Sequence, residues 1–144
     1  MNIYFCGSIR GGRDLAASYA KMIEMLGTYG KVLTEHLGSN EEIESKDRIL
    51  SDKEIHDRDF QWILESDLLV AEVTIPSLGV GYEIGRAIEL GKPVLSLFKK
   101  GSDYTISAMI SGSDQVEMTY YKNLEEVQDI FKEYFKSHVP HRTS

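Results

Sequence analysis

Residues 68–73 form a short, largely apolar run, Leu-Leu-Val-Ala-Glu-Val. A loop of Pro, Ser and Gly follows this run, and a helical pattern then continues to a Gly-Lys-Pro stop at 91–93. A short apolar run bounded by turn residues is typical of a strand buried on both faces of a parallel sheet. Glu83 therefore falls near the start of a helix at the carboxyl edge of a sheet, where open α/β folds bind ligands.

Strand and helix signals alternate along the whole chain, which is the pattern of a parallel α/β sheet. The expected strands are residues 2–6, 31–34, 68–73, 93–98 and 115–120. The expected helices are residues 12–27, about 47–65, the segment that contains Glu83, and about 122–136. Right-handed crossovers make 2-1-3-4-5 the simplest strand order. We therefore predict one domain over residues 1–144, an α/β fold with a doubly wound, Rossmann- or flavodoxin-like five-stranded parallel sheet and helices on both faces.

Apolar positions in two of the predicted helices indicate which faces turn inward. In the first helix they keep helical spacing, at Leu15, Tyr19, Met22, Ile23 and Leu26. In the helix over 47–65, the positions expected to face inward are Ile49, Ile55, Phe60, Ile63 and Leu64. Residues 36–47 carry no apolar period and residues 101–114 are rich in Gly and Ser, so both are predicted to be loops.

Composition narrows the classes of function. Hydrophobic residues make up 42% of the 144 positions and charged residues 27%, which are globular values. The net charge of −7 disfavours binding to a nucleic acid polymer, which requires a basic surface, although residues 8–13 hold a local basic excess that suits a small phosphorylated ligand. No apolar run reaches membrane-spanning length, so no membrane partner is expected. The lone Cys6 fits a reducing compartment and a buried apolar role, so we expect a cytoplasmic protein, or a nuclear one in a eukaryote.

The first candidate site is the segment Tyr-Phe-Cys-Gly-Ser-Ile-Arg-Gly-Gly-Arg at residues 4–13. A strand runs into a glycine-containing turn and then a helix, so the backbone can approach a ligand closely and the helix start adds partial positive charge. Ser8 can donate a hydroxyl hydrogen, and Arg10 can bind a phosphate. The glycine spacing matches neither the dinucleotide fingerprint nor a Walker A loop. A tight turn with solvated arginines explains these residues equally well.

The second candidate site joins Ser77, Gly79 and Glu83. Ser77 and Gly79 can supply hydroxyl and amide donors to a phosphate at the helix start, with Glu83 beside it. The alternative is that Glu83 only pairs with Arg86 three positions on, which is a common surface contact on helices.

The third candidate is Asp59, in the acidic stretch 54–62. Its spacing from Phe60 and Ile63 could point Asp59 toward the edge of the sheet, although a charge run on a helix is usually a solvated face. His36 and His56 are expected to be surface or packing residues. No cluster of Cys, His and carboxylate has metal-binding spacing, so no metal site is predicted.

These three segments, in this order, resemble the 2'-deoxynucleoside 5'-phosphate N-hydrolase family, which belongs to the wider nucleoside 2-deoxyribosyltransferase-like group. The matching stretches are residues 4–13, 32–36, 57–87 and 107–110. The most specific are the first glycine turn with its preceding tyrosine and the segment Ser-Leu-Gly-Val-Gly-Tyr-Glu-Ile-Gly-Arg-Ala at 77–87. The resemblance covers nearly the whole chain, and it implies an enzyme that needs no cofactor.

The resemblance also implies a role for each matching residue. Glu83 aligns with the nucleophile of the family, Tyr4 with the tyrosine that orients it, and Asp59 with the acid/base aspartate. The residues aligned with phosphate-binding positions are Gly7, Ser8, Ile9 and Arg10 in the first turn and Ser77 and Gly79 in the second. The stretch 107–110 adds Ser107 and Met109 to the substrate-binding residues, and Ser107 aligns with a serine that reaches the phosphate from the other subunit of a homodimer.

The implied reaction is hydrolysis of the N-glycosidic bond of 2'-deoxynucleoside 5'-monophosphates to a free base and 2-deoxyribose 5-phosphate, through a glycosyl-enzyme intermediate. The two carboxyls then need different pKa values. We expect the helix start and a hydrogen bond from Tyr4 to favour ionised Glu83, and Asp59 to hold or receive a proton. The alternatives are a deoxyribosyltransferase, in which a second base replaces water, and a non-catalytic nucleotide-binding module in which Glu83 is structural.

Overall fold

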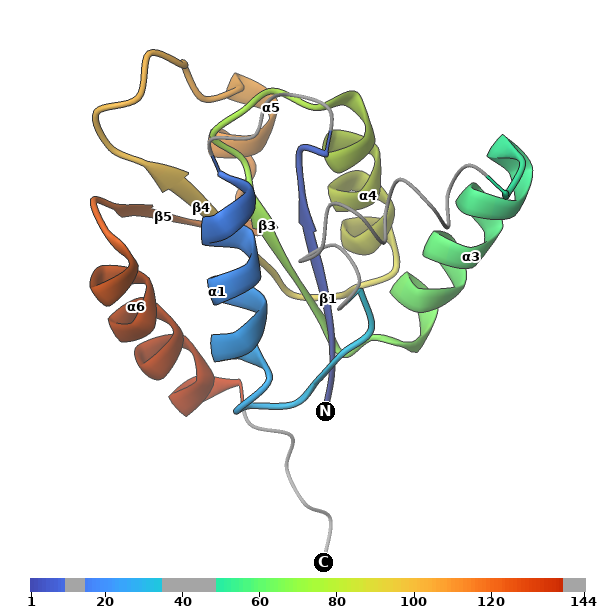
Figure 1. The fold of residues 1–144 in the computed structure, drawn as a ribbon, viewed down its shortest axis with the longest axis horizontal. Helices are drawn as coiled ribbons and strands as arrows, with labels where there is room; N and C mark the ends of the chain where they lie inside the picture. The colour runs from blue at the N-terminus through green and yellow to red at the C-terminus, as the bar shows by residue number, and fades with distance from the viewer. Residues whose placement is uncertain (10–14, 35–48, 139–144) are drawn as a thin grey trace, which may run out of the picture.

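The computed structural model describes residues 1–9, 15–34 and 49–138. Its strands are β1 (Asn2–Gly7), β2 (Lys31–Val32), β3 (Leu68–Glu72), β4 (Val94–Lys99) and β5 (Val116–Tyr121). They form one five-stranded sheet in the order β2-β1-β3-β4-β5, and every neighbouring pair is parallel. Figure 1 shows β5, β4, β3 and β1 following one another from left to right, and the full order confirms the predicted strand order and fold class.

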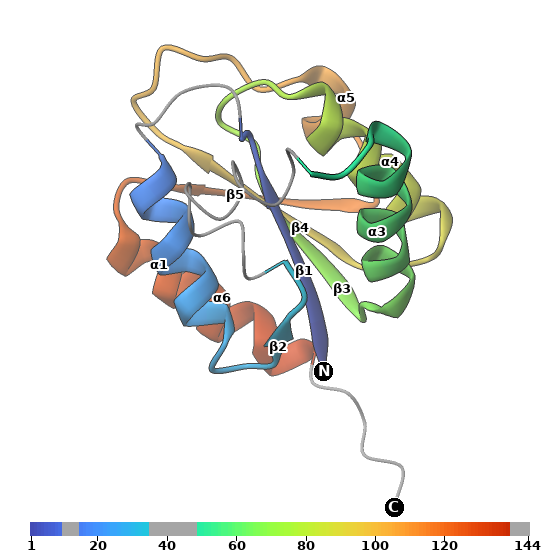
Figure 2. The ribbon, with the colours of Figure 1, turned by 45° about the vertical axis from the view of Figure 1, so that its right-hand side comes forward.

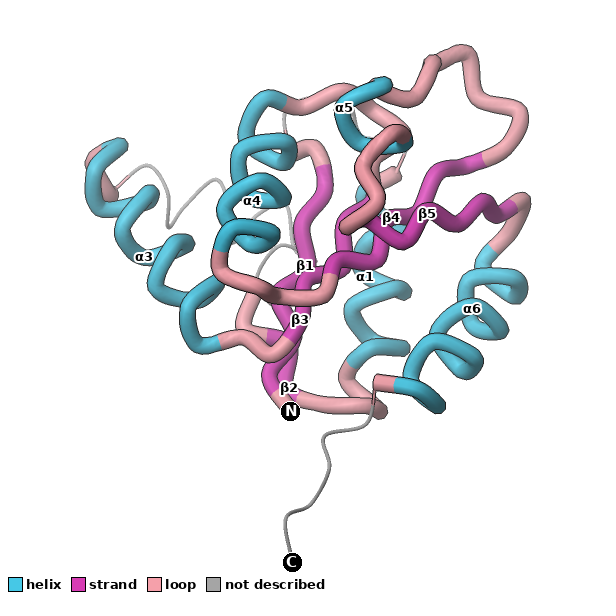
Figure 3. The backbone as a smooth tube through the Cα atoms, turned by 180° about the vertical axis from the view of Figure 1, so that it is seen from behind, coloured by secondary structure: helices cyan, strands magenta, loops and turns pink. Residues whose placement is uncertain are grey.

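Helices cover both faces of the sheet. They are α1 (Ala16–Leu26), α3 (Asp52–Glu65), α4 (Leu78–Glu89), α5 (Ala108–Ser111) and α6 (Leu124–Ser137). Figure 2 shows α1 and α6 on one side of the sheet and α3 and α4 on the other. Figure 3 shows the molecule from behind, with the short α5 at the top of the view next to the upper end of α4.

Two apolar clusters hold these layers together. Side chains of β1 alternate between them, as the two-residue period of a strand requires. Ile3 and Phe5 join the cluster under α1 and α6, whereas Tyr4 and Cys6 join the cluster under α3 and α4. All the inward positions predicted for the first helix are buried, and Cys6 is a buried free thiol, as expected.

The strand register brings the ends of the central strands to one level. Gly7, the last residue of β1, pairs with Glu72, the last residue of β3, and Glu72 in turn pairs with Leu97 on β4. The turn after β1 and the loop between β3 and α4 therefore leave the sheet side by side at its carboxyl edge. This is the edge at which open α/β sheets bind ligands.

The helix predicted over 47–65 differs from the observed α3. It begins at Asp52, because Ser51 is the N-cap and forms a capping box with Glu54. Ile49 therefore precedes the helix and is 84% exposed, and Leu64 is 41% exposed, so the prediction that both face inward is wrong. Ile63 is buried as predicted. The buried stripe is narrow because α3 packs beside α4 and β1 at the margin of the sheet.

The loop predicted over 101–114 contains a short helix, α5, of four residues. Ser107 caps α5 by accepting a hydrogen bond from the backbone N–H of Met109 at 3.2 Å. A single capping serine does not stand out in a segment that is already polar. β2 ends at Val32 and is shorter than the predicted 31–34. The predicted helix start at 12 and the predicted loop 36–47 lie outside the described residues. In the part of the chain that the structure describes, no helix has the length and apolar character needed to cross a membrane.

Candidate active site

Tyr4 and Glu83 form the centre of the candidate site. Strand alternation turns Tyr4 toward α4, and only 1% of its surface is exposed. Its hydroxyl donates a hydrogen bond to Oε2 of Glu83, in the second turn of α4. Arg86 makes other contacts: its guanidinium donates a hydrogen bond to the hydroxyl of Tyr82 and lies 4.0 Å from the ring centroid of Phe60. The structure therefore differs from the alternative of a simple Glu83–Arg86 surface pair.

The proton affinity of Glu83 is set mainly by burial. Burial raises its pKa from the ordinary 4.5 to about 7; the hydrogen bond from Tyr4 lowers it, and the charge of Asp59 adds to the rise. The Tyr4 bond acts in the expected direction, but desolvation outweighs it. The carboxyl therefore exchanges its proton near neutral pH. Burial, and then the charge of Glu83, raise the pKa of Tyr4, so its hydroxyl stays protonated and remains a donor.

Asp59 lies on α3, near enough to Glu83 for the two charges to interact. Its charge contributes to the raised pKa values of Glu83, Tyr4 and the Cys6 thiol. Arg58 contacts Asp59 through Nη2 at 2.9 Å and Nε at 3.0 Å, and the Asp59 side chain is 31% exposed. The structure thus brings the three predicted catalytic residues, Tyr4, Asp59 and Glu83, to one region between β1, α3 and α4.

The turn after β1 presents Gly7, Ser8 and Ile9. A Cβ built on Gly7 lies 2.8 Å from the ring of Tyr19, so a side chain at this position collides with α1. Ser8 is buried, whereas Ile9 is 52% exposed. Arg10, the fourth predicted phosphate residue of this turn, lies outside the described residues.

Ser77 and Gly79 lie at the start of α4. Ser77 is the N-cap, and its Oγ accepts a hydrogen bond from the backbone N–H of Val80 at 3.3 Å, so the hydroxyl hydrogen is left to donate. A Cβ built on Gly79 lies 3.8 Å from Oε1 of Glu83 and 3.9 Å from Oγ of Ser77, which are ordinary contact distances. The folded chain itself therefore tolerates a larger residue, and glycine leaves space between the helix start and Glu83. The N–H groups of a first helical turn suit an anion in that space.

Ser107 and Met109 line a different space. A cavity of about 800 Å³ lies between α4 and the segment 105–110, on the side of α4 turned away from Glu83. Its walls are mostly apolar, and Ser77 also lines it. Met109 is 83% exposed, and Leu78, which also lines the cavity, is 97% exposed. Within one chain, Ser107 and Met109 are therefore apart from the Tyr4–Glu83 pair.

Sequence reasoning missed a fully buried carboxyl at the same edge of the sheet. Glu72 accepts hydrogen bonds from the backbone N–H of Thr74 at 2.7 Å, from the Thr74 hydroxyl at 3.0 Å, and from the hydroxyl of Tyr121. The Thr74 hydroxyl oxygen in turn accepts from the N–H of Lys99 at 2.8 Å. Burial raises the pKa of Glu72, while its hydrogen bonds lower it. The network joins the ends of β3, β4 and β5, and the one polar residue in the apolar run 68–73 was its signal in the sequence.

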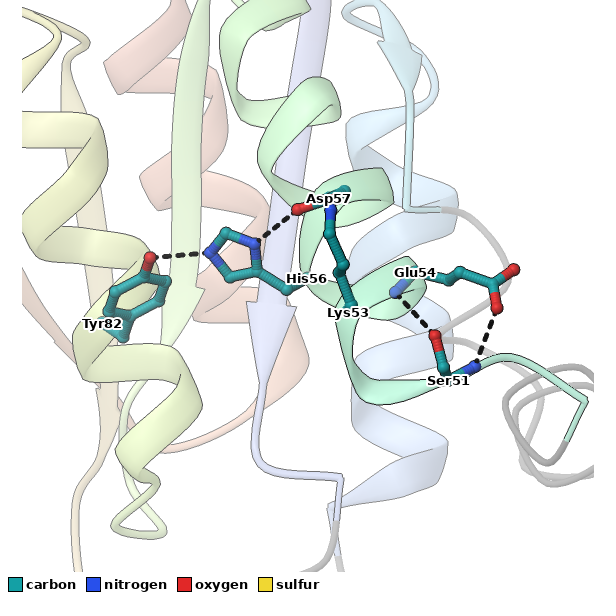
Figure 4. A network of polar contacts seen from close by, with 6 residues as sticks. All are labelled: Ser51, Lys53, Glu54, His56, Asp57 and Tyr82. Carbon is teal, nitrogen blue, oxygen red and sulfur yellow. Dashed lines mark hydrogen bonds and ion pairs between the residues drawn. The ribbon is translucent and has the colours of Figure 1, made fainter.

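Histidines show no arrangement for metal binding in the described ranges. Nδ1 of His56 lies 3.0 Å from Oδ1 of Asp57 and Nε2 lies 2.7 Å from the hydroxyl of Tyr82, so His56 is a surface residue with two polar contacts (Figure 4). His36 lies outside the described residues. Across residues 1–9, 15–34 and 49–138, no three His, Cys, Asp or Glu side chains form a group that could hold a metal ion.

The sequence matches a known family model over nearly the whole chain. The family model described as nucleoside 2-deoxyribosyltransferase matches residues 3–134, a range that includes Tyr4, Asp59 and Glu83. The chain belongs to the nucleoside 2-deoxyribosyltransferase family. The resemblance predicted from the sequence is thereby confirmed.

Proteins from vertebrates are similar over almost the full chain. A Mus musculus protein named 5-hydroxymethyl-dUMP N-hydrolase is 46% identical over 147 residues, covering 99% of this chain and 84% of its own. A Danio rerio protein of the same name is 48% identical over 140 residues, covering 95% of this chain and 97% of its own. The solved structure of a Clostridium botulinum CMP N-glycosidase superposes with a TM-score of 0.61, covering 93% of this chain and 99% of that chain. At 19% identity this last likeness supports the fold alone.

Proposed function

We propose that this protein hydrolyses the N-glycosidic bond of 2'-deoxynucleoside 5'-monophosphates, releasing a free base and 2-deoxyribose 5-phosphate. The observation that carries the proposal is the hydrogen bond from Tyr4 to Glu83 at the carboxyl edge of the sheet, within range of the charge of Asp59. The names of the mouse and zebrafish relatives, both N-hydrolases of a deoxynucleoside monophosphate, support the same reaction.

In this reaction Glu83 is the nucleophile and Asp59 the acid and base. The carboxylate of Glu83 attacks C1' of the deoxyribose on the face opposite the base, so that a C1'–O bond forms as the C1'–N bond breaks. The bonding electron pair leaves with the base, which Asp59 protonates. Water then attacks C1', Asp59 takes its proton, and Glu83 is released as a carboxylate. The hydroxyl of Tyr4 orients Glu83 through both steps.

The raised pKa of Glu83 fits this role. Glu83 must be ionised to attack, so a pKa of about 7 makes the first step faster as the pH rises through neutrality.

The 5'-phosphate in this proposal lies between the two loops at the sheet edge. Gly7, Ser8, Ile9 and Arg10 supply one side, and Ser77 and Gly79 at the start of α4 supply the other. The support is the N-cap position of Ser77 and the space that Gly79 leaves beside Glu83. A phosphate held away from the bond being broken anchors the sugar and keeps the reacting atoms in line.

A homodimer completes the site in this proposal, with Ser107 and Met109 reaching the partner subunit's substrate. The support is that both residues lie on the side of α4 turned away from Glu83, beside the apolar cavity of about 800 Å³. Leu78 and Met109 are 97% and 83% exposed, and large apolar side chains gathered on one face mark an interaction surface.

Deoxyribosyl transfer to a second base is the other candidate, favoured by the description of the matching family model. The two reactions share the glycosyl-enzyme intermediate and differ in whether water or a base attacks it. The names of the vertebrate relatives make 5-hydroxymethyl-dUMP the first substrate to test.

The test is product analysis with 5-hydroxymethyl-dUMP and the common deoxynucleoside monophosphates, with and without an acceptor base. Glu83→Gln removes the nucleophile, and Glu89→Gln, at an exposed position of the same helix, is the matched control. Free base and deoxyribose 5-phosphate from the wild type and the control, but not from Glu83→Gln, support the hydrolase. A new nucleotide formed only with acceptor base supports the transferase. Binding without turnover across the panel overturns both and leaves a nucleotide-binding module.

A further inference from the structure

The helix that carries Asp59 has few buried contacts of its own. Ile63 is the one fully buried residue of α3. The C-terminal end of α3 is fixed by Lys92, whose ammonium group donates to the carbonyl oxygens of Leu64 at 3.1 Å and Ser66 at 2.7 Å. Asp59 lies about one helical turn before Ile63. Asp59 is in the middle of α3, so its position also depends on the contacts that the helix makes ahead of Ile63.

Four side chains hold the middle of α3 against α4, and we call them the α3–α4 clasp: His56 and Phe60 on α3, and Tyr82 and Arg86 on α4. The two members on each helix are four residues apart, so they lie one above the other on one helix face. Nε2 of His56 lies 2.7 Å from the hydroxyl of Tyr82, a contact drawn in Figure 4. Arg86 donates to the same hydroxyl, and its guanidinium lies 4.0 Å from the centroid of the Phe60 ring.

Members of the clasp adjoin both candidate catalytic carboxyls in the chain. Tyr82 directly precedes Glu83, and Phe60 directly follows Asp59. Neighbouring residues of a helix move together, so any displacement of α3 against α4 at the clasp changes the separation of the Asp59 and Glu83 carboxyls. The contacts of the clasp therefore influence the distance between the Asp59 and Glu83 carboxyls directly.

We propose that the α3–α4 clasp is a positioning device that sets the distance between the carboxyls of Asp59 and Glu83. The inference rests on the proposed function, in which one carboxyl attacks the sugar while the other protonates the base. In retaining glycosidases the two carboxyls stand about 5–5.5 Å apart. A misplacement of about 1 Å can cost roughly a hundredfold in rate, so contacts outside the core are sufficient to control turnover.

The variant Tyr82→Phe tests the clasp, because it removes both hydroxyl contacts and keeps the ring. We expect kcat to fall about 5- to 30-fold and KM to change by less than about twofold, since the proposed phosphate loops lie elsewhere. His56→Leu removes one of the same contacts from the other side. The double variant should therefore match Tyr82→Phe within about twofold rather than multiply the two losses.

The matched control is Gln61→Ala, at an exposed position of α3. Gln61 donates to the carboxylate of Glu65 one turn along the helix at 3.1 Å, a contact within α3 that involves no member of the clasp. Its loss should leave kcat and KM unchanged. An equal loss of kcat in Gln61→Ala and Tyr82→Phe would mean that general loosening of α3, not the contact with α4, is responsible, and would overturn the clasp.

Two readouts without substrate separate this inference from the proposed function. Hydrogen exchange of the α3 amides should speed up in Tyr82→Phe, and the Glu83 pKa measured by NMR should fall as the charge of Asp59 moves away. If both changes occur in a protein without turnover, the positioning role stands and the proposed function fails. If the wild type turns over and Tyr82→Phe alters neither kcat, exchange nor the Glu83 pKa, the proposed function stands and the clasp is overturned.

Discussion

The hydroxyl of Tyr4 on β1 donates a hydrogen bond to the carboxylate of Glu83 on α4, across 79 positions of the chain. The bond lies in a partly buried setting, where desolvation raises the pKa of Glu83 and Tyr4 restrains that rise. Removing one oxygen atom from Tyr4 therefore alters the charge state of the proposed nucleophile without removing the nucleophile itself.

Tyr4→Phe should raise the pKa of Glu83 above its value of about 7, because the bond that stabilises the ionised form is lost. Glu83 is active when ionised, so the acidic limb of the kcat/KM–pH profile, which reports the free enzyme, should move to higher pH. At pH 7 we expect a loss of about 10- to 100-fold in kcat, the scale of one hydrogen bond to a charged group. Kinetics from pH 5 to 9 measure the shift, with the exposed Tyr104→Phe as control. An unmoved acidic limb contradicts the prediction.

Glu83 should also make the protein less stable as the pH rises. Its folded pKa of about 7 lies above the ordinary 4.5, so between these values the folded state holds a proton that the unfolded state has released. Stability contributed by the neutral carboxyl is complete below pH 4.5 and is lost as the pH rises through 7. Relative to the wild type, Glu83→Gln should therefore gain on the order of 1 kcal/mol in unfolding free energy between pH 5 and pH 8, a figure reduced for solvent screening. Urea unfolding at both pH values measures the difference, and equal pH dependence of the two proteins would refute it.

The two site glycines should respond differently to alanine. In Gly7→Ala the new Cβ meets the Tyr19 ring at 2.8 Å, so the turn or the ring must shift and stability should fall by about 1–3 kcal/mol. In Gly79→Ala the new Cβ sits at 3.8 Å from Glu83 and 3.9 Å from Ser77, so the melting temperature should hold. The same Cβ fills the space proposed for phosphate, so KM should rise about tenfold or more. Thermal melts and steady-state kinetics distinguish the two, and equal melting temperatures would contradict the contrast.

Tyr121→Phe should destabilise the fold through Glu72. The carboxyl of Glu72 is fully buried and loses one of its three hydrogen bonds, while both bonds from Thr74 remain. An under-satisfied buried acceptor costs about 1–3 kcal/mol. Chemical unfolding measures the loss, and Tyr120→Phe, at the neighbouring 45% exposed position, should change stability by less than about 0.5 kcal/mol.

Mixed dimers test the proposed contribution of Ser107 to the partner's site. Ser107→Ala and Glu83→Gln should each be impaired alone. In a mixed dimer, the intact Glu83 of one subunit meets the intact Ser107 of the other, so one complete site forms. Refolding the two variants together should therefore give more activity than the sum of both alone. Activity no greater than that sum would place Ser107 in its own subunit's site or outside any site.

The strands and helices were predictable because their signals in the sequence are short-range, and the strand order followed from them. The apolar runs at 68–73 and 93–98 and the helical spacing from Leu15 to Leu26 are visible in the sequence, and right-handed crossovers leave one simple order. The prediction was wrong for Ile49 because this residue precedes α3, and wrong for Leu64 because α3 lies at the margin of the sheet, where part of its apolar surface stays exposed. It missed α5, because a helix of four residues has no period to detect.

That Tyr4, Asp59 and Glu83 lie in one region was predictable from motifs that resemble a known family. Their environment was not. Tyr4 was expected to favour ionised Glu83, and it does, but the larger effect of burial became visible only in the folded chain. The Glu72–Tyr121 bond spans 49 positions, and no local pattern pairs its two residues.

The sequence by itself determined the strand order, the places of the glycine turns and the position of Glu83 at the sheet edge, because strands and turns follow from residue type and spacing over a few positions and right-handed crossovers leave one simple order. Only the tertiary structure decided the proton affinity of Glu83, the side of α4 on which Ser107 lies, and the contact between His56 and Tyr82. Each of these depends on desolvation or on contacts between residues far apart in the chain, which come into being only when the helices pack on the sheet.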